Sequence, residues 1–162
     1  MNAFLPSAFI LSMRAASTGS SGGANGSLSI TTSDKASPRT STPSQKLLVA
    51  TSSANQCQYC VVAHGAILRV RARNPLLADQ VAINYRKADI SPRQKAMLDF
   101  ALKVSTQSHL VDEQDFDVLA QHGFDREDAW DIAAISAFFG LSNRMANVTS
   151  MRPNDEFYTL GR

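Results

Sequence analysis

From residue 44 to the C-terminus, apolar residues recur at helical spacing, and no stretch alternates apolar and polar residues between hairpin turns. In residues 93–104, for example, Met97, Ala101 and Val104 share one face of a helix. A Ser91-Pro92 pair precedes that segment as a cap and first-turn proline. The pattern predicts an all-α fold with a compact helical domain, in which further helices lie at about 45–55, 57–72, 74–85, 111–123 and 126–150.

Two expectations concern exposure. The last predicted helix is apolar nearly all round from Ile132 to Leu141, so we expect it to be buried, with Trp130, Phe138 and Phe139 in the core. The stretch "RVRAR" carries Arg69, Arg71 and Arg73 at the end of the second predicted helix. Cations complement the helix dipole there, so we interpret them as a solvated helix end and not as an anion site.

The first 43 residues have a different composition. Of the thirty residues 15–44, eighteen are Ser, Thr or Gly, too polar a stretch to offset the entropy of ordering. We therefore predict a disordered low-complexity tail at 1–43 and a helical domain at 44–162. Ser-rich sequence with sparse arginine and little acid is also typical of a mitochondrial transit peptide. The expected location is the cytoplasm, with the mitochondrion as the alternative.

The charge distribution argues against nucleic acid as a partner. The formal net charge is +2, and from residue 44 onward thirteen basic residues balance thirteen acidic ones. The sequence contains no run of about 18 apolar residues, so no membrane span is indicated. Two cysteines are too few for a disulfide scaffold, and a close pair favours redox or metal chemistry in a reducing compartment. We expect neither nucleic acid nor a membrane to be a partner.

The two cysteines stand in "NQCQYCVVAHG", residues 55–65. If Asn55 caps a helix, then Cys57, Cys60 and His64 lie on one face of it. The first turn favours negative charge and so a thiolate, and His64 can accept a proton from Cys60. A second thiol one turn away can convert a sulfenic acid into a disulfide. The spacing suits a peroxidatic cysteine, a resolving cysteine and an acid/base.

Other interpretations of the motif remain open. Buried cysteines often have a purely structural role. A structural zinc site needs four ligands, whereas the motif supplies three, and His109 and His122 lie near predicted helix ends. Covalent haem requires a histidine directly after the second cysteine, where this chain has Val61. We expect no metal and no cofactor.

Three segments, in order along the chain, resemble the alkylhydroperoxidase D-like proteins of the carboxymuconolactone decarboxylase superfamily, in the branch called peroxidase-related. They are "SSANQCQYCVVAHGAIL", "FFGLSNRMA" and "RPNDEFYTLGR". The resemblance covers residues 44–162 and implies a helical fold, homo-oligomers and thiol-dependent reduction of hydroperoxides. It implies that Cys60 is the peroxidatic cysteine, Cys57 its resolving and more accessible partner, and His64 the relay histidine. It also implies a dithiol electron donor, either a lipoyl protein or a thioredoxin-like protein.

The chain departs from the family in two places. The family typically has a glutamate twelve residues before the first cysteine, acting as a base in the proton relay, and here that residue is Gln45. An amide cannot accept a proton at neutral pH, and general-base steps contribute about 10²–10⁴-fold, so we expect activity that is low and not absent. Members of this branch also carry a helical segment before the cysteines, where this chain has the Ser/Gly-rich tail.

The sequence therefore predicts a thiol-dependent peroxidase of the alkyl hydroperoxide reductase type in antioxidant defence. Two alternatives stay open: a carboxymuconolactone decarboxylase-like lyase, and a non-catalytic oligomeric relic in which Gln45 has broken the relay. Replacing Cys57 separates them. Its loss stops turnover in a peroxidase, has little effect on a lyase that shuttles protons, and alters only the stability of a relic.

Overall fold

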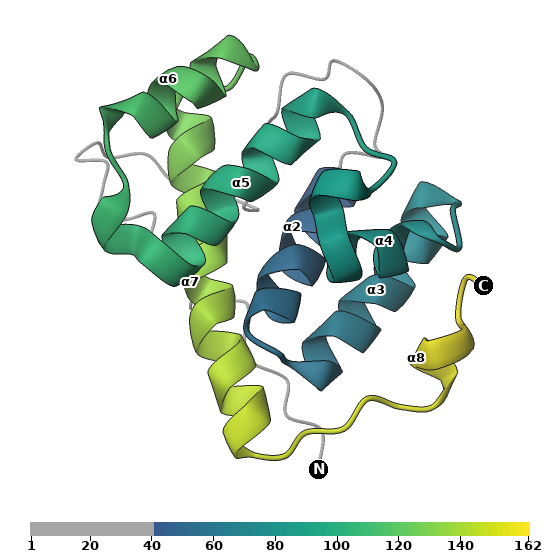
Figure 1. The fold of residues 1–162 in the computed structure, drawn as a ribbon. Coiled ribbons are helices and arrows are strands. Elements are labelled where there is room, and N and C mark those ends of the chain that lie inside the picture. The colour runs from purple at the N-terminus through teal and green to yellow at the C-terminus, as the bar shows by residue number, and fades with distance from the viewer. Residues whose placement is uncertain (1–40) are drawn as a thin grey trace, which may run out of the picture. The chain divides into compact units, whose positions relative to one another are not determined.

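The structure is a computed structural model that describes residues 41–162, with side chains from Thr42 onward. In this part of the chain every regular element is helical, which confirms the predicted all-α fold. The predicted tail lies outside the described residues, except for its last three, which form the first turn of α2. The elements (Figure 1) are α2 (Ser41–Ala54), α3 (Gln58–Ala72), α4 (Leu77–Asn84), η1 (Tyr85–Lys87), α5 (Pro92–Gln107), η2 (Ser108–Leu110), α6 (Glu113–Gln121), α7 (Arg126–Val148) and α8 (Glu156–Thr159).

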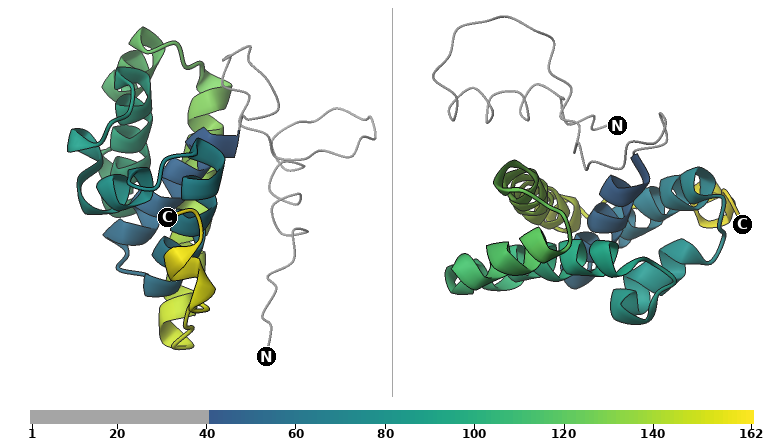
Figure 2. Two further views of the ribbon diagram at one scale, coloured as in Figure 1. Left: turned by 90° about the vertical axis from the view of Figure 1, so that its right-hand side faces the viewer. Right: turned by 90° about the horizontal axis from the view of Figure 1, so that it is seen from above.

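Helix α2 is the centre of the domain. It packs against α3, α4, α5 and α7, and the view from above in Figure 2 shows it between α3 and α7. Removal of each large aliphatic side chain from water contributes about 1.5–3 kcal/mol, so this helix anchors the fold. Its almost completely buried residues include Leu47, Val49, Thr51 and Ser52.

Most of the predicted helix ends are confirmed. Ser91, Asp112 and Asp125 each begin a helix with a capping box, in which a side chain accepts a hydrogen bond from an otherwise unpaired N–H group. Gly123 follows α6 with a φ of +77°, a conformation that glycine adopts at no steric cost. Local capping chemistry therefore fixes these boundaries.

The predicted cap at Asn55 is wrong. Cys57 is the N-cap of α3, and its Sγ atom accepts from the backbone N–H of Cys60. The Asn55 amide instead donates to the carbonyl of Thr51 and to Oδ1 of Asn143. The Asn55 side chain, which local rules predict as the helix cap, is therefore used in a long-range hydrogen bond to α7.

The prediction that α7 is buried all round is also wrong, because α2 already occupies the centre and α7 lies against one side of it. Trp130 is 54% exposed, whereas Phe138 and Phe139 are half-buried.

Neither α7 nor any other helix in the described range is long and apolar enough to cross a membrane. The homo-oligomer stays a prediction. Other exposed apolar residues of α7 are Leu141, Met145 and Val148.

After α7 the chain reverses at Ser150, which has a φ of +53°, and continues as residues 151–162, here named the C-terminal strap. Figure 1 shows this strap running from the lower end of α7 to α8 beside α3. Arg69 of α3 is buried and donates to the carbonyls of Phe157 and Leu160 in the strap. The expected solvated helix end is therefore wrong for this arginine, which fastens the C-terminus to α3.

Candidate active site

The structure brings Cys57 and Cys60 together at the N-terminal end of α3. Sγ of Cys57 lies 3.4 Å from the backbone nitrogen of Cys60, and neither cysteine is in a disulfide. Both are buried in a small cluster with Ala146 of α7, against which Tyr59 and Met151 pack. Cys57 is 1% exposed and Cys60 3%. The greater accessibility of Cys57 that the resemblance implied is therefore absent in this structure.

Burial decides the ionisation of Cys60. Loss of solvent raises the pKa of the Cys60 thiol to about 12, and the adjacent Cys57 thiol also raises it. Hydrogen bonds from Asn143 and Ser52 act in the opposite direction but do not outweigh burial. The thiolate expected from the helix terminus is therefore not the form of Cys60 in this conformation, since desolvation exceeds the effect of the helix end.

A buried polar network backs the cysteines. Nδ2 of Asn143 donates to Oγ of Ser52 at 3.0 Å, and Oδ1 of Asn143 accepts from Nδ2 of Asn55 at 3.1 Å. Ser52 and Asn143 are both 0% exposed. Both residues belong to segments that carry the family resemblance, Ser52 to "SSANQCQYCVVAHGAIL" and Asn143 to "FFGLSNRMA", but local spacing predicts no role for either. The network places hydrogen-bond donors beside Cys60, where a developing thiolate would need them.

His64 lies in a different environment. Its Nδ1 atom is 3.1 Å from Oε1 of Gln45 on α2, and its ring meets the edge of Phe139 on α7 at 5.1 Å between centroids. With Oε1 of Gln45 facing the ring, this hydrogen bond requires the proton on Nδ1, which puts the lone pair on Nε2. Burial lowers the pKa of His64 to about 4, so the ring is neutral at physiological pH.

Within the described residues, no hydrogen bond joins His64 to either thiol. The structure therefore unites Cys57 with Cys60 but does not place His64 in direct contact with them. Gln45 stands beside His64, where a glutamate would face the ring with a full negative charge. Proton transfer between the thiol and the imidazole requires an intervening water or a side-chain movement.

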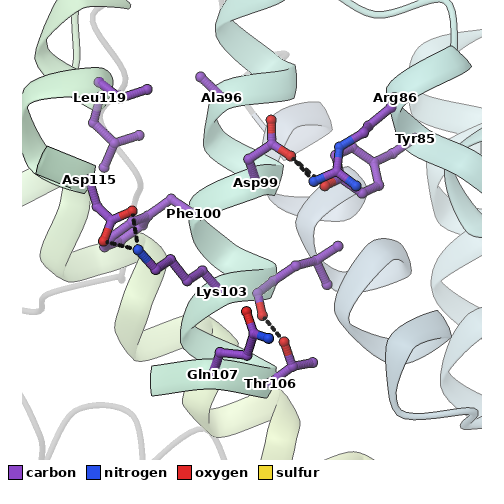
Figure 3. Close-up of a pocket in the computed structure, with 12 residues that line it drawn as sticks. Tyr85, Arg86, Ala96, Asp99, Phe100, Lys103, Thr106, Gln107, Asp115 and Leu119 are labelled. Atoms are coloured by element: carbon purple, nitrogen blue, oxygen red, sulfur yellow. Dashed lines mark hydrogen bonds and ion pairs between the residues drawn. The ribbon is translucent and has the colours of Figure 1, made fainter. Parts of the chain in front are cut away.

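A hollow of about 580 Å³ lies along α5, and its lining shares no residue with the cysteine site. Its charges are already paired, Lys103 with Asp115 and Arg86 with Asp99, as Figure 3 shows. Its lining contains no cysteine and no histidine. Among the described residues, no group of three or more His, Cys, Asp or Glu side chains could hold a metal ion. The cysteine pair is accordingly the candidate active site.

A solved structure resembles this fold over most of the described residues. It is an uncharacterized peroxidase-related protein from Ralstonia eutropha JMP134, described as an alkylhydroperoxidase AhpD core. It is 66% identical, with a TM-score of 0.75, and the match covers 79% of this chain and 67% of that chain. The chain belongs to the alkylhydroperoxidase D-like family.

A second solved structure matches the chain to a similar extent. An uncharacterized peroxidase-related protein from Silicibacter sp. TM1040 is 41% identical, with a TM-score of 0.74, over 78% of this chain and 66% of that one. No family model and no curated protein matches the chain. The resemblance found in the three sequence segments is confirmed at the level of the peroxidase-related branch.

Proposed function

We propose that this chain is a thiol-dependent peroxidase that reduces hydroperoxides through Cys57 and Cys60. One observation carries the proposal: two reduced thiols meet at the start of a helix, in a chain of the alkylhydroperoxidase D-like family. A pair of thiols in contact supplies the two electrons that cleavage of one peroxide bond consumes. Such a pair can also close a disulfide without movement of another element.

The reaction has three steps. The Cys60 thiol first loses its proton, and the thiolate attacks the hydroperoxide ROOH. The O–O bond breaks, Cys60 becomes a sulfenic acid, and RO⁻ takes a proton and leaves as ROH. The Cys57 thiol then attacks the sulfenic sulfur, which releases water and forms the Cys57–Cys60 disulfide. An external dithiol, from a lipoyl protein or a thioredoxin-like protein, reduces the disulfide and is itself oxidised.

The side chains around Cys60 have separate roles in this proposal. Asn143 and Ser52 stabilise the thiolate, because their hydrogen bonds favour the charged form. His64 is the acid/base that receives the proton through a water and returns it to the departing alkoxide. Gln45 fixes the tautomer of His64 but cannot share its proton, so we expect proton transfer to limit the rate.

The protonation states of Cys60 and His64 favour a second candidate, a non-catalytic relic. The Cys60 thiol has a raised pKa, the His64 ring is neutral, and Gln45 supplies no charge to either. A chain kept only for its fold would tolerate these features. The two proposals differ in whether the thiols turn over.

Turnover of an organic hydroperoxide by the purified chain with a dithiol reductant tests the proposal. Cys60→Ser and Gln45→Glu are assayed beside the natural sequence, with circular dichroism to verify folding. Activity that disappears in Cys60→Ser and rises in Gln45→Glu supports a peroxidase limited at its relay. Folded proteins without turnover in all three cases support the relic.

A further inference from the structure

The first residue of the C-terminal strap packs against the cluster that contains both thiols. This residue is Met151, and the cluster is formed by Cys57, Cys60 and Ala146. The backbone N–H of Met151 donates to the carbonyl of Ala146 at 2.9 Å, and the positive φ of Ser150 turns the chain toward α3. The thiol cluster therefore contains a residue of α7 and contacts the first residue of the strap.

The strap is held mainly by the helix that carries the cysteines. Gln58 lies between the two cysteines in sequence, and its Nε2 atom donates to the Tyr158 hydroxyl at 3.0 Å. Arg69 binds two carbonyls of the strap at 2.6 and 2.9 Å. Arg162, the last residue, pairs with Asp79 of α4 at 2.9 Å. These anchoring contacts all lie outside the cluster of Cys57, Cys60 and Ala146.

Gly161 allows the end of the strap to approach α3 closely. Its φ is +77°, and a Cβ atom there would lie 2.9 Å from Cβ of Arg69 and 3.1 Å from the backbone nitrogen of Val70. Both neighbours belong to a rigid helix and cannot move aside cheaply. A methyl group at this position would therefore lift the end of the strap without removing a hydrogen-bonding side chain.

The strap is also the kind of segment that opens locally. Its only regular element is the four-residue α8, and Tyr158 and Leu160 are both more than 40% exposed. Segments with few buried apolar contacts open at a lower free energy than the whole domain. Opening at Met151 would admit water to the thiol cluster and so remove the desolvation that disfavours a thiolate.

We propose that the C-terminal strap is a gate that determines which reactants reach Cys57 and Cys60. In the closed position it excludes bulky reagents, and a protein-borne dithiol must displace it to reach the disulfide. The identity of these reactants rests on the proposed peroxidase function, whereas the gate itself does not. Gln58 and Tyr158 link the position of the strap to the turn of α3 that holds both thiols.

The gate is tested by thiol reactivity in the reduced full-length chain, with no peroxide present. The rate of reaction with 5,5′-dithiobis(2-nitrobenzoate) is compared with that of the smaller iodoacetamide. We expect Gly161→Ala to raise the rate for the bulky reagent by about tenfold, in line with the cost of a left-handed alanine, and to raise the iodoacetamide rate less. Gly123→Ala is the control, because Gly123 has the same φ of +77° but follows α6.

A second variant removes the anchors without straining the backbone. Tyr158→Phe with Arg162→Ala deletes the hydrogen bond to Gln58 and the ion pair to Asp79, and hydrogen exchange of residues 151–162 reports release of the strap. Accelerated thiol reaction in both variants, with Gly123→Ala unchanged, supports the gate. Unchanged rates in both variants, or natural-sequence thiols as reactive as those of the unfolded chain, would overturn it. Accelerated reaction without hydroperoxide turnover would support the gate and reject the peroxidase.

Discussion

The thiol end and the histidine end of the predicted catalytic face have different surroundings. Cys60 lies beside Asn143 and Ser52, whose hydrogen bonds favour a thiolate. His64, four residues further along α3, meets the ring of Phe139 and the neutral amide of Gln45. Both groups are held in their uncharged forms by burial, but only the thiol has neighbours that oppose this effect.

The two ends differ in whether neighbouring groups stabilise the charged form of the site residue. The thiol end has two cysteines and hydrogen-bond donors. The histidine end has a base but no charge that would stabilise its protonated form. If the chain is a peroxidase, sulfur chemistry is intact and proton transfer sets the rate. Four predictions test this contrast, in order of decreasing effect.

The largest effect is expected at the thiol end. Cys60→Ser should abolish hydroperoxide turnover, because a serine hydroxyl is not ionised at neutral pH and cannot be oxidised by the peroxide. Cys57→Ser should allow one sulfenic acid to form on Cys60 but no disulfide. A dimedone adduct on Cys60, detected by mass spectrometry in Cys57→Ser alone, checks both statements. Turnover that persists in Cys60→Ser would remove the thiols from the mechanism.

At the histidine end, Gln45→Glu should raise turnover on the order of 10²-fold, within the range of general-base contributions. A carboxylate beside Nδ1 would stabilise the imidazolium and raise the pKa of His64 toward neutrality. The pH profile of turnover with the dithiol donor in excess is the measurement. Gln114→Glu, at an exposed position in α6, is the charge control. Equal turnover in Gln45→Glu and the natural sequence would refute a proton-transfer limit.

Asn143→Asp should slow the alkylation of Cys60 about tenfold at pH 8. The substitution keeps the shape and the acceptor for Asn55 but removes the donor to Ser52 and adds a negative charge next to the thiol. Loss of a buried hydrogen bond should also cost about 1–3 kcal/mol of stability. Asn84→Asp, on an exposed residue of α4, is the control. A thiol reaction rate equal to that of the control would show that Asn143 has only a structural role.

The smallest effect concerns stability and pH. The folded state keeps His64 neutral down to about pH 4, whereas the unfolded chain protonates it near pH 6.5. Stability from this residue is therefore complete above pH 6.5 and is lost as the pH falls toward 4, by about 1–3 kcal/mol. Urea unfolding at pH 7 and pH 4.5 should show a smaller decrease for His64→Asn than for the natural sequence. Identical decreases would mean that burial does not perturb His64.

Local patterns were sufficient to predict most of the fold. The helix starts at Ser91, Asp112 and Asp125 and the stop at Gly123 depend on one or two neighbouring residues, which the sequence displays. Asn55 misled the prediction because its partner, Asn143, is 88 residues away. Trp130 misled it because periodicity shows how apolar a helix is but not which of its sides another helix covers.

The candidate site was predicted as a set of residues but not as an environment. The spacing of Cys57 and Cys60 brings the thiols together whatever surrounds α3. Their cluster also contains Ala146 of α7 and contacts Met151 of the strap, and the contact between His64 and Gln45 depends on how α2 packs against α3. These distant contacts determine the protonation of both groups, and no local rule contains them.

The most direct measurement is the intact mass and thiol count of the reduced chain after one equivalent of an organic hydroperoxide. We expect the chain to lose two hydrogen atoms and both free thiols, a dithiol to restore them, and Cys57→Ser to form no such disulfide. A chain that keeps both thiols reduced while remaining folded would contradict the claim that Cys57 and Cys60 are a peroxide-reducing pair.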